Sequence, residues 1–312
     1  MKFFAPSGKC SILPLGALCY ALLQFAAPGP VTHAAEPKVK KVLFIGIDGC
    51  RPDALLAADA PHLKQLIATG AFSDQAQTGE LTVSGPSWSS ALCGVWAGKH
   101  GVTNNNFAPA RYGEYPNVLV RLKTARPMSY VASAAHWEPI RSKMITTADH
   151  TSAHRSGAEV TAAACKLLDE ASPDLLFLHF DDVDHAGHST GYGPQFKPYL
   201  AAIHGVDAQI GQVLAALRRR PAFGREDWLI ALTTDHGGSQ KGHGKNTPAH
   251  RTIFVILHGS SIQPGQIDPA PNIVDLLPTL LEHLEVTIDP GWKLDGKSLA
   301  TGRRGTSKTP PR

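Results

Sequence analysis

VLFIGIDG, residues 42–49, is an unbroken apolar run that stops at an aspartate followed by a glycine. Such a run is typical of a strand that is buried on both faces, as in a parallel sheet. Asp48 stands where this strand would end, so its carboxylate would lie at the edge of the sheet. An aspartate beside a glycine is also common in ordinary turns, and this segment alone does not indicate a site.

Apolar and periodic segments along the rest of the chain predict alternating strands and helices. Strands are expected at residues 130–134, 174–180, 228–233 and 252–257, and helices at residues 61–69, 86–95, 157–168, 198–219 and 273–284. This alternation predicts an α/β fold with a mainly parallel central sheet and helices on both faces. In such sheets ligands bind beyond the carboxyl ends of the strands, which directs attention to the residues that follow each strand.

A second strand end carries a cluster of acids and histidines. Residues 177–188 read FLHFDDVDHAGH, which we interpret as a strand followed by a polar loop. Asp184 and His188 are four residues apart, so one turn of this loop could direct both side chains at one ion. Carboxylate oxygens and imidazole nitrogens together are typical zinc ligands.

A third strand end has the sequence LTTDHGG, residues 232–238. Adjacent side chains of a strand point apart, so Asp235 and His236 could bind one ion only if the backbone turns there. The two glycines that follow permit such a turn, and His243 comes next on a glycine-flanked loop. Each of these pieces could be structural, but their coincidence at strand ends predicts a metal site.

The hydroxyl group that is best placed for nucleophilic attack belongs to Ser84. It stands before a predicted helix that has Pro86 near its first turn. Free amide groups and the helix dipole favour an anion there, so the Gly85 amide is expected to hold a phosphate attacked by Ser84. The alternative is that Ser84 serves only as the N-cap of the helix.

Taken in order, these motifs resemble those of the alkaline phosphatase superfamily, specifically its nucleotide pyrophosphatase/phosphodiesterase branch. The resemblance extends from residue 42 to about residue 299. The segments that carry it are residues 47–49 (IDG), 84–86 (SGP), 94–102 (GVWAGKHGV), 104–106 (NNN), 184–188 (DHAGH), 235–237 (DHG) and 295–299 (DGKSL). It implies an alkaline-phosphatase-like fold and two zinc ions, although other divalent metals could replace zinc.

The resemblance also implies roles for individual residues. The positions that match the family's ligands are Asp48, Ser84, Asp235 and His236 for one ion, and Asp184, His188 and a further histidine for the other. We choose His243 as that histidine, with His250 as the alternative. Asn105 matches the family's phosphate-contacting asparagine. The implied reaction is hydrolysis of a small phosphoester through a phosphoseryl intermediate on Ser84, where many members of the branch use threonine.

Three other functions remain as alternatives: a phosphomonoesterase, a sulfatase of the same superfamily, and a non-catalytic exported binding protein. Residues 84–87 (SGPS) resemble the start of the motif that sulfatases convert to formylglycine. Trp88 stands where that motif has arginine, and Gly49 stands where sulfatases have a second aspartate. The chain is also short for the family, so the sequence does not predict which ester is the natural substrate.

The two ends of the chain differ from its body. Residues 1–35 have two lysines, an apolar run at residues 12–27 and small residues at the end, which is typical of a secretory signal peptide. We therefore expect a periplasmic or secreted protein with no stable membrane span after cleavage. The catalytic domain would comprise residues 36–302, and the basic residues 303–312 would form a disordered tail.

The charge and the cysteines exclude two further interpretations. The formal net charge of +4 falls to −2 when the two lysines of residues 1–35 and the four basic residues of residues 303–312 are left out, so a partner of duplex nucleic acid is not indicated. Beyond residue 35 there are three cysteines, Cys50, Cys93 and Cys165. An odd number argues against a disulfide framework. The sequence carries no sign of the oligomeric state.

Overall fold

The central sheet of the computed structural model has eight strands in the order β4-β3-β5-β1-β6-β7-β2-β8. The structure describes residue 8 and residues 37–300. The strands are β1 Val39–Ile47, β2 Ala71–Gln77, β3 Val131–Ala135, β4 His150–Ala153, β5 Leu175–Phe180, β6 Glu226–Thr233, β7 Thr252–His258 and β8 Gly265–Gln266. Neighbours from β4 to β6 pair in parallel, whereas β7 is antiparallel to both β6 and β2. The predicted α/β class with a mainly parallel sheet is therefore confirmed.

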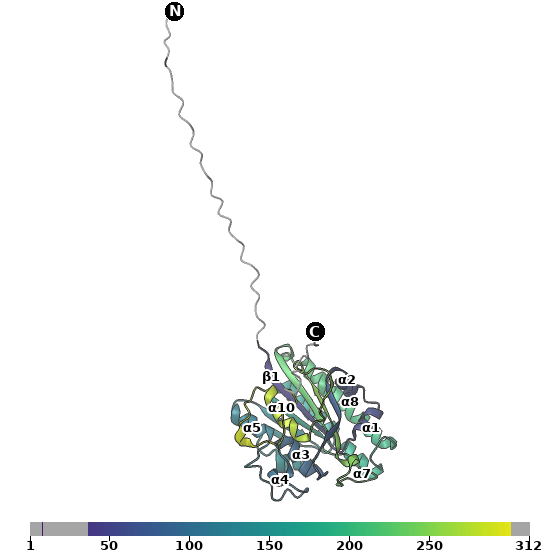
Figure 1. Cartoon of the computed structure of the whole chain (residues 1–312). Coiled ribbons are helices and arrows are strands. Elements are labelled where there is room, and N and C mark those ends of the chain that lie inside the picture. Colours follow the sequence, from purple (N-terminus) through teal and green to yellow (C-terminus); the bar gives the residue numbers. More distant parts are fainter. Residues whose placement is uncertain (1–7, 9–36, 301–312) are drawn as a thin grey trace, which may run out of the picture. The chain divides into compact units, whose positions relative to one another are not determined.

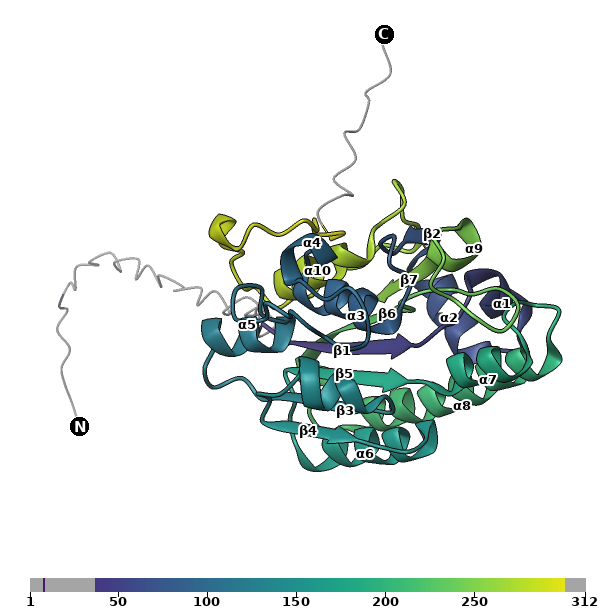
Figure 2. The ribbon, with the colours of Figure 1, turned by 90° about the horizontal axis from the view of Figure 1, so that it is seen from below.

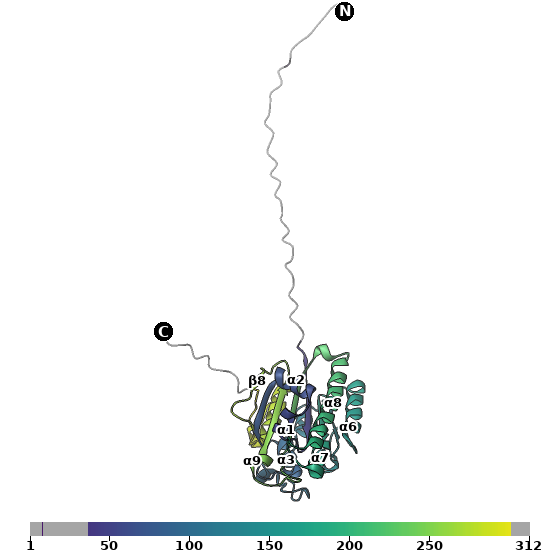
Figure 3. The ribbon, with the colours of Figure 1, turned by 90° about the vertical axis from the view of Figure 1, so that its right-hand side faces the viewer.

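Helices cover both faces of this sheet. They are α1 Pro52–Ala57, α2 Pro61–Thr69, α3 Ser84–Cys93, α4 Ala97–His100, α5 Val118–Ala125, α6 Gly157–Glu170, α7 Asp182–Thr190, α8 Lys197–Arg219, α9 Pro248–Arg251 and α10 Leu276–His283, with short π or 3-10 turns at Ile140–Met144, Phe223–Arg225, Ile273–Asp275 and Pro290–Trp292. One hydrophobic core joins the sheet to α1, α2, α6, α7 and α8, and a second joins it to α3, α5 and α10. Figure 1 shows α5 and α10 on one side of the strands and α1, α2 and α8 on the other. Figure 2 shows α3, α4 and α10 close together, and Figure 3 shows α6, α7 and α8 grouped on one side of the strands.

The alternation of side chains along β1 explains why both faces are needed. Leu43 and Ile45 enter the core under α1, α2 and α8, whereas Val42 and Phe44 enter the core under α3 and α10. All four side chains are fully buried. A continuous apolar strand can be stable in water only when both faces are covered in this way.

The expected strands and helices agree with the observed ones to within a few residues at each end, with one important difference. The segment after β5 was expected to be a loop, but residues from Asp182 to Thr190 form helix α7. Its histidines and glycine have weak helix propensity, which gave no indication of a helix. Packing of Val183 into the core, together with contacts between α7 and α8, stabilises it instead. Strands β2, β4 and β8 and helices α1, α4, α5 and α9 were also missed.

Within the described ranges, α8 alone has the length and mean hydropathy of a membrane-spanning helix. We had expected no segment after residue 35 to be long and apolar enough to span a membrane, and for α8 that expectation was wrong. The apolar face of α8 is used inside the protein, because Ile203, Val206 and Ile210 are buried in the core and α8 packs against α6 and α7.

The predicted basic tail and all of the predicted signal peptide except residue 8 lie outside the described residues, so both remain predictions. Cys50, Cys93 and Cys165 are free thiols.

Gly46 of β1 faces α3 so closely that a Cβ atom at this position would overlap the Trp88 ring. We predict that Gly46→Ala lowers the free energy of unfolding by about 1–3 kcal/mol, because the ring must shift within a packed core. The matched control is Gly205→Ala in the middle of α8, where a Cβ would meet nothing. This control should raise stability by about 0.5–1 kcal/mol. Urea unfolding of both variants measures the difference, and an unchanged stability of Gly46→Ala would contradict it.

Candidate metal centre

The candidate site lies where the three central neighbours β5, β1 and β6 end. Asp48 directly follows β1, Asp184 and His188 lie on α7 after β5, and Asp235 and His236 follow β6. The parallel register places these ends side by side, with Ile47 opposite Phe180 and Gly46 opposite Thr233. Residues as far apart in the sequence as Asp48 and His236 therefore contribute to one cluster.

The first cluster surrounds the ring nitrogen Nε2 of His236. This atom lies 3.3 Å from Oδ2 of Asp235, 3.5 Å from Oδ1 of Asp48 and 3.4 Å from the hydroxyl oxygen of Ser84. Asp48, Asp235 and His236 are almost completely buried. The predicted first set of residues is thus brought together in full.

The protonation of His236 is set by its other nitrogen. Nδ1 lies 2.9 Å from the carbonyl oxygen of Gly237, and a carbonyl can only accept, so Nδ1 carries the proton. In the neutral ring Nε2 is then an unprotonated acceptor directed at two carboxylates. Three hydrogen-bond acceptors, the Asp48 and Asp235 carboxylates and Nε2 of His236, therefore face one another.

The two carboxylates are each held by one oxygen only. Oδ2 of Asp48 accepts from Nε1 of Trp88 at 2.8 Å and contacts Nε2 of His179 at 3.0 Å, and Oδ1 of Asp235 accepts the Gly49 amide hydrogen at 3.1 Å. In the described part of the chain, the remaining oxygens, Oδ1 of Asp48 and Oδ2 of Asp235, are buried without a hydrogen-bond partner. Buried acceptors without a donor are rare in native proteins and indicate a missing cation or water.

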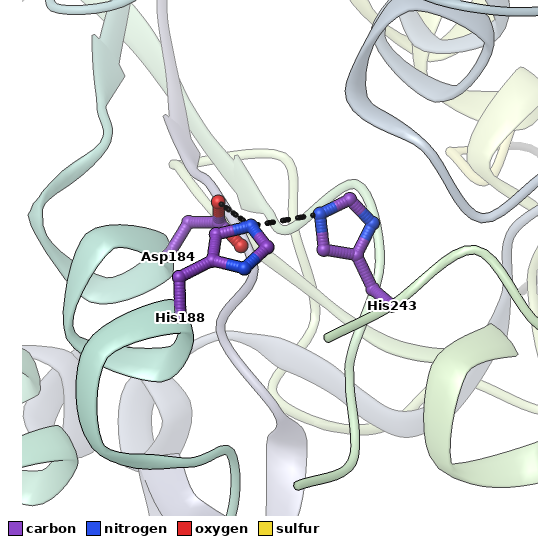
Figure 4. Close-up of side chains that lie close together, drawn as sticks. All are labelled: Asp184, His188 and His243. Carbon is purple, nitrogen blue, oxygen red and sulfur yellow. Dashed lines mark hydrogen bonds and ion pairs between the residues drawn. The ribbon is translucent and has the colours of Figure 1, made fainter. Parts of the chain in front are cut away.

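The second cluster consists of Asp184, His188 and His243 (Figure 4). Nε2 of His188 lies 3.2 Å from Oδ2 of Asp184 and 3.1 Å from Nε2 of His243. The spacing of four residues on helix α7 places Asp184 and His188 on one face, so a helical turn brings them together where a loop had been expected.

Both histidines of this cluster are anchored in the same way as His236. Nδ1 of His188 donates to the carbonyl of Lys241 at 3.1 Å, and Nδ1 of His243 donates to the carbonyl of Thr82 at 2.9 Å. Burial lowers the pKa of His243 to about 4, so its ring is neutral at pH 7. Metal-binding histidines almost always donate their second N–H to a carbonyl or carboxylate, which is the arrangement found here.

The electrostatics of the centre also fit a divalent cation. Burial, and then the negative charges of Asp235 and Asp184, raise the pKa of Asp48 well above its ordinary value. Burial likewise raises the pKa of Asp235, with Asp184 adding to the effect. Oxygen and nitrogen atoms of Asp48, Asp184 and His236 also lie close enough together to hold one ion. A cation among these groups would offset the repulsion that keeps protons on the carboxylates.

The alternative ligand His250 has both ring nitrogens engaged elsewhere. Nε2 contacts the Ser239 hydroxyl at 2.8 Å, and Nδ1 accepts the Lys245 amide hydrogen at 3.2 Å. His250 therefore supports the loop that carries His243, and the structure brings His243 to the cluster instead.

Ser84 is not the N-cap of its helix, so that alternative is wrong. Helix α3 begins at Ser84, its N-cap is Val83, and the Ser84 hydroxyl faces His236. The expectation for the Gly85 amide was wrong as well, because this N–H donates to Oδ1 of Asn105 at 2.8 Å. Asn105 thus lies beside the start of α3, next to Ser84, with its side-chain oxygen already occupied.

Sequence reasoning missed the groups that orient the carboxylates. His179 interrupts the otherwise apolar strand β5 (LLFLHF), which was a usable signal for a buried functional histidine. Trp88 was considered only as a departure from the sulfatase motif, and not as a hydrogen-bond donor to Asp48. Tyr192, whose hydroxyl contacts Asp184, gave no sequence signal at all.

A family model described as the metalloenzyme superfamily matches residues 105–287, which is more than half of the chain. The chain belongs to the metalloenzyme superfamily. A second model, type I phosphodiesterase / nucleotide pyrophosphatase, matches residues 42–158 and contains Asp48 and Ser84. Together they confirm the resemblance to the nucleotide pyrophosphatase/phosphodiesterase branch of the alkaline phosphatase superfamily.

Individual relatives are distant. A bovine (Bos taurus) protein named bis(5'-adenosyl)-triphosphatase ENPP4 is 24% identical over 245 residues, covering 72% of this chain and 52% of its own length. The chain thus spans about half the length of such curated relatives. Murine ectonucleotide pyrophosphatase/phosphodiesterase 5, solved as an inactive variant with AMP, has a TM-score of 0.62 and 15% identity over 80% of this chain and 96% of that one.

The same fold also occurs in sulfatases. A 2-O GAG sulfatase gives a TM-score of 0.71 at 14% identity, covering 88% of this chain and 76% of that one. At these identities the structural comparisons show a shared α/β fold and do not distinguish phosphoester from sulfate ester chemistry.

We predict that Asp48 and Asp235 make the metal-free protein lose stability as pH rises above the ordinary carboxyl pKa of about 4, up to their raised pKa values in the folded state. Raised pKa values of Asp48 and Asp235 mean that the folded state binds more protons than the unfolded state, and each group then removes up to about 1.4 kcal/mol per pH unit. Histidines with lowered pKa values act in the opposite sense only below about pH 6.5. Urea unfolding of chelator-treated protein at several pH values measures the slope.

Asp48→Asn should make this slope shallower, and Asp59→Asn, whose parent side chain is 86% exposed, should leave it unchanged. Added Zn²⁺ should stabilise the wild type increasingly at the alkaline end, because cation and proton compete for the same carboxylates. A flat profile of the metal-free wild type would contradict the proposed repulsion.

Proposed function

We propose that the protein is an exported phosphoester hydrolase of the phosphodiesterase/nucleotide pyrophosphatase type, which uses two divalent ions, zinc in the first place, and Ser84 as its covalent nucleophile. The observation that carries this proposal is the convergence, beside a serine hydroxyl, of three imidazole nitrogens and of two buried carboxylate oxygens that have no hydrogen-bond partner among the described residues. Export rests on the pattern of residues 1–35 alone.

Two sets of ligands follow from the geometry. Asp48, Asp235, His236 and the Ser84 hydroxyl would hold one ion, and Asp184, His188 and His243 would hold the other. Carboxylate and imidazole ligands suit zinc, although manganese or iron also bind such sets. The two sets differ in one respect: of the two, the first alone includes the proposed nucleophile, Ser84.

The chemistry requires a deprotonated serine. When bound, the ions would lower the pKa of the Ser84 hydroxyl and of the attacking water and would neutralise charge on the phosphoryl group. Ser84 loses its proton to solvent, and Oγ forms a bond to phosphorus while the bond to the leaving oxygen breaks. The leaving group departs with the electron pair and takes up a proton from water. A water molecule then attacks the phosphoseryl group and releases the product and the Ser84 hydroxyl.

Asn105 would support the same phosphoryl group. Its Oδ1 accepts from Gly85, and this bond fixes the amide plane beside Ser84. We propose that the Nδ2 group donates to a phosphoryl oxygen, a contact that is valuable when charge grows on that oxygen in the transition state.

The charge of the centre favours a diester over a monoester. Three carboxylates and the Ser84 alkoxide carry four negative charges, which two divalent ions would balance. A diester brings one further negative charge, whereas a phosphomonoester brings about two near pH 7. The names of the relatives, a bis(5'-adenosyl)-triphosphatase and a protein solved with AMP, are consistent with nucleotide-type esters.

The sulfatase alternative is supported by the fold comparison and opposed by two residues. A Cβ atom at Gly49 would overlap Oδ1 of Asp184, and Gly49 has a φ of +61°, so this backbone position does not accept a second aspartate. Trp88 is fully buried and donates to Asp48, at the position where the sulfatase motif has an arginine.

Ser84→Ala should lower kcat by at least about a thousandfold, because the covalent route is lost. Ser84→Thr is the matched control: it keeps a hydroxyl at the same atom and should retain measurable turnover. In the acid-quenched wild type, mass spectrometry should find phosphate on the peptide that contains Ser84. Retention of most activity by Ser84→Ala with an activated diester would exclude the serine mechanism.

A panel of three chromogenic esters tests the substrate class. Bis-p-nitrophenyl phosphate should be hydrolysed with at least about tenfold higher kcat/KM than p-nitrophenyl phosphate, with p-nitrophenyl sulfate slower still. Chelator should abolish all activity and Zn²⁺ should restore it. Preference for the monoester would make the protein a phosphatase, and cleavage of the sulfate alone would overturn the proposal. A protein that neither binds zinc nor hydrolyses any ester would support a binding role.

A further inference from the structure

Tyr192 is a fully buried tyrosine that contacts the second candidate metal set without belonging to it. Its hydroxyl donates to Oδ1 of Asp184 at 2.5 Å. Its ring packs edge-on against His188, with ring centroids 5.6 Å apart, and against His243 at 6.2 Å. One side chain therefore touches all three members of the set.

The ring occupies a slot that two glycines keep open. A Cβ atom at Gly187 would overlap the Tyr192 ring, and a Cβ atom at Gly238 would do the same from the opposite loop. Gly187 lies between Asp184 and His188 on α7, and Gly238 lies between His236 and His243. Both metal-facing segments thus close around the same ring.

The backbone of Tyr192 joins these segments as well. Tyr192 and Gln240 form an isolated antiparallel bridge, in which the Tyr192 amide donates to the Gln240 carbonyl at 2.7 Å. The next residue, Lys241, supplies the carbonyl that fixes His188. The backbone contacts of Tyr192 therefore help to fix the distance between His188 on α7 and His243 on the loop.

We propose that Tyr192 is a positioning residue of the second metal set, and that its hydroxyl selects which oxygen of Asp184 faces the ion. This inference rests on the proposed function. With Oδ1 held by the hydroxyl, Oδ2 is directed at His188 and the shared space. Without the hydroxyl, the Asp184 carboxylate can rotate and present either oxygen to the ion. Metal binding must then fix its orientation, and the lost rotational freedom lowers the affinity for the ion.

The same division recurs at the other two carboxylates, which strengthens the inference. Trp88 and His179 hold the outer oxygen of Asp48, and the Gly49 amide holds the outer oxygen of Asp235. Tyr192 is the corresponding donor for Asp184. Each candidate carboxylate ligand thus has one oxygen fixed by the protein and one left for the ion.

The test is Y192F, which removes the hydroxyl and keeps the ring in its slot. Zn²⁺ affinities of the purified full-length protein are measured by competition with a chromophoric chelator, and Co²⁺ titrations followed by absorption distinguish the two sites. We expect one of the two sites to weaken by about 10–100-fold and the other to change little. With Zn²⁺ below saturation kcat should fall, and raising Zn²⁺ should restore it, with little change in KM.

Tyr199→Phe is the matched control. Tyr199 is equally buried, and its ring is tilted by 59° against that of Tyr192 with centroids 5.6 Å apart. Among the described residues its hydroxyl bonds the backbone alone, at the Gly49 carbonyl and the Arg51 amide. This variant should lose stability in urea without the selective loss of one metal site. A merely structural role for Tyr192 would give the same result for both variants.

The outcomes separate this inference from the proposed function. If the wild type binds no Zn²⁺ or Co²⁺, the proposed function itself fails. If the wild type binds two ions and Y192F binds both with unchanged affinity, the proposed function stands and the role of Tyr192 is overturned. Equal weakening of both sites, or weakening that Tyr199→Phe reproduces, overturns it as well.

Discussion

The structure depends on one unfavourable arrangement: buried hydrogen-bond acceptors that face one another without donors. Among the described residues Oδ1 of Asp48 and Oδ2 of Asp235 are buried without a hydrogen-bond partner, and Nε2 of His236 lies 3.5 and 3.3 Å from them. Removing such groups from water costs free energy that no protein donor offsets here. A divalent cation would use the same lone pairs as ligands, so this polar interior has the chemistry of a candidate metal centre.

The fold provides the rigidity that this arrangement needs. Three neighbouring parallel strands end together, and their apolar residues are covered by helices on both faces. Side chains at these ends cannot relax away from one another without breaking the sheet. The donors behind the carboxylates, Trp88, His179, the Gly49 amide and Tyr192, come from four different parts of the chain. The core that buries them therefore also fixes the direction of every carboxylate.

The elements and the inward-facing residues of the centre were visible in the sequence because their signals are local. An apolar run that stops at an aspartate identifies both a buried strand and its end, as at Asp48 and Asp235. Helix α7 was missed because tertiary packing, not propensity, stabilises it. The Gly85–Asn105 bond and the Tyr192–Asp184 bond could not be foreseen, since each depends on how loops fold back over the strand ends. Pattern thus identifies ligands more readily than the groups that orient them.

Gly49 determines how many carboxylates the end of β1 can supply to the candidate metal centre. Its positive φ turns the chain immediately after Asp48, its amide fixes Asp235, and the space beside its Cα is filled by Asp184. A second aspartate at this strand end would displace the carboxylate that the other set of ligands needs. The centre is thereby restricted to three carboxylates, whose charge, with that of the Ser84 alkoxide, two divalent ions would just balance. A site of this composition would gain least from a phosphomonoester with about two negative charges, whereas a phosphodiester and a sulfate monoester each bring only one. The charge balance therefore bears on the choice between diester and monoester, and the backbone at Gly49 bears on the sulfatase alternative.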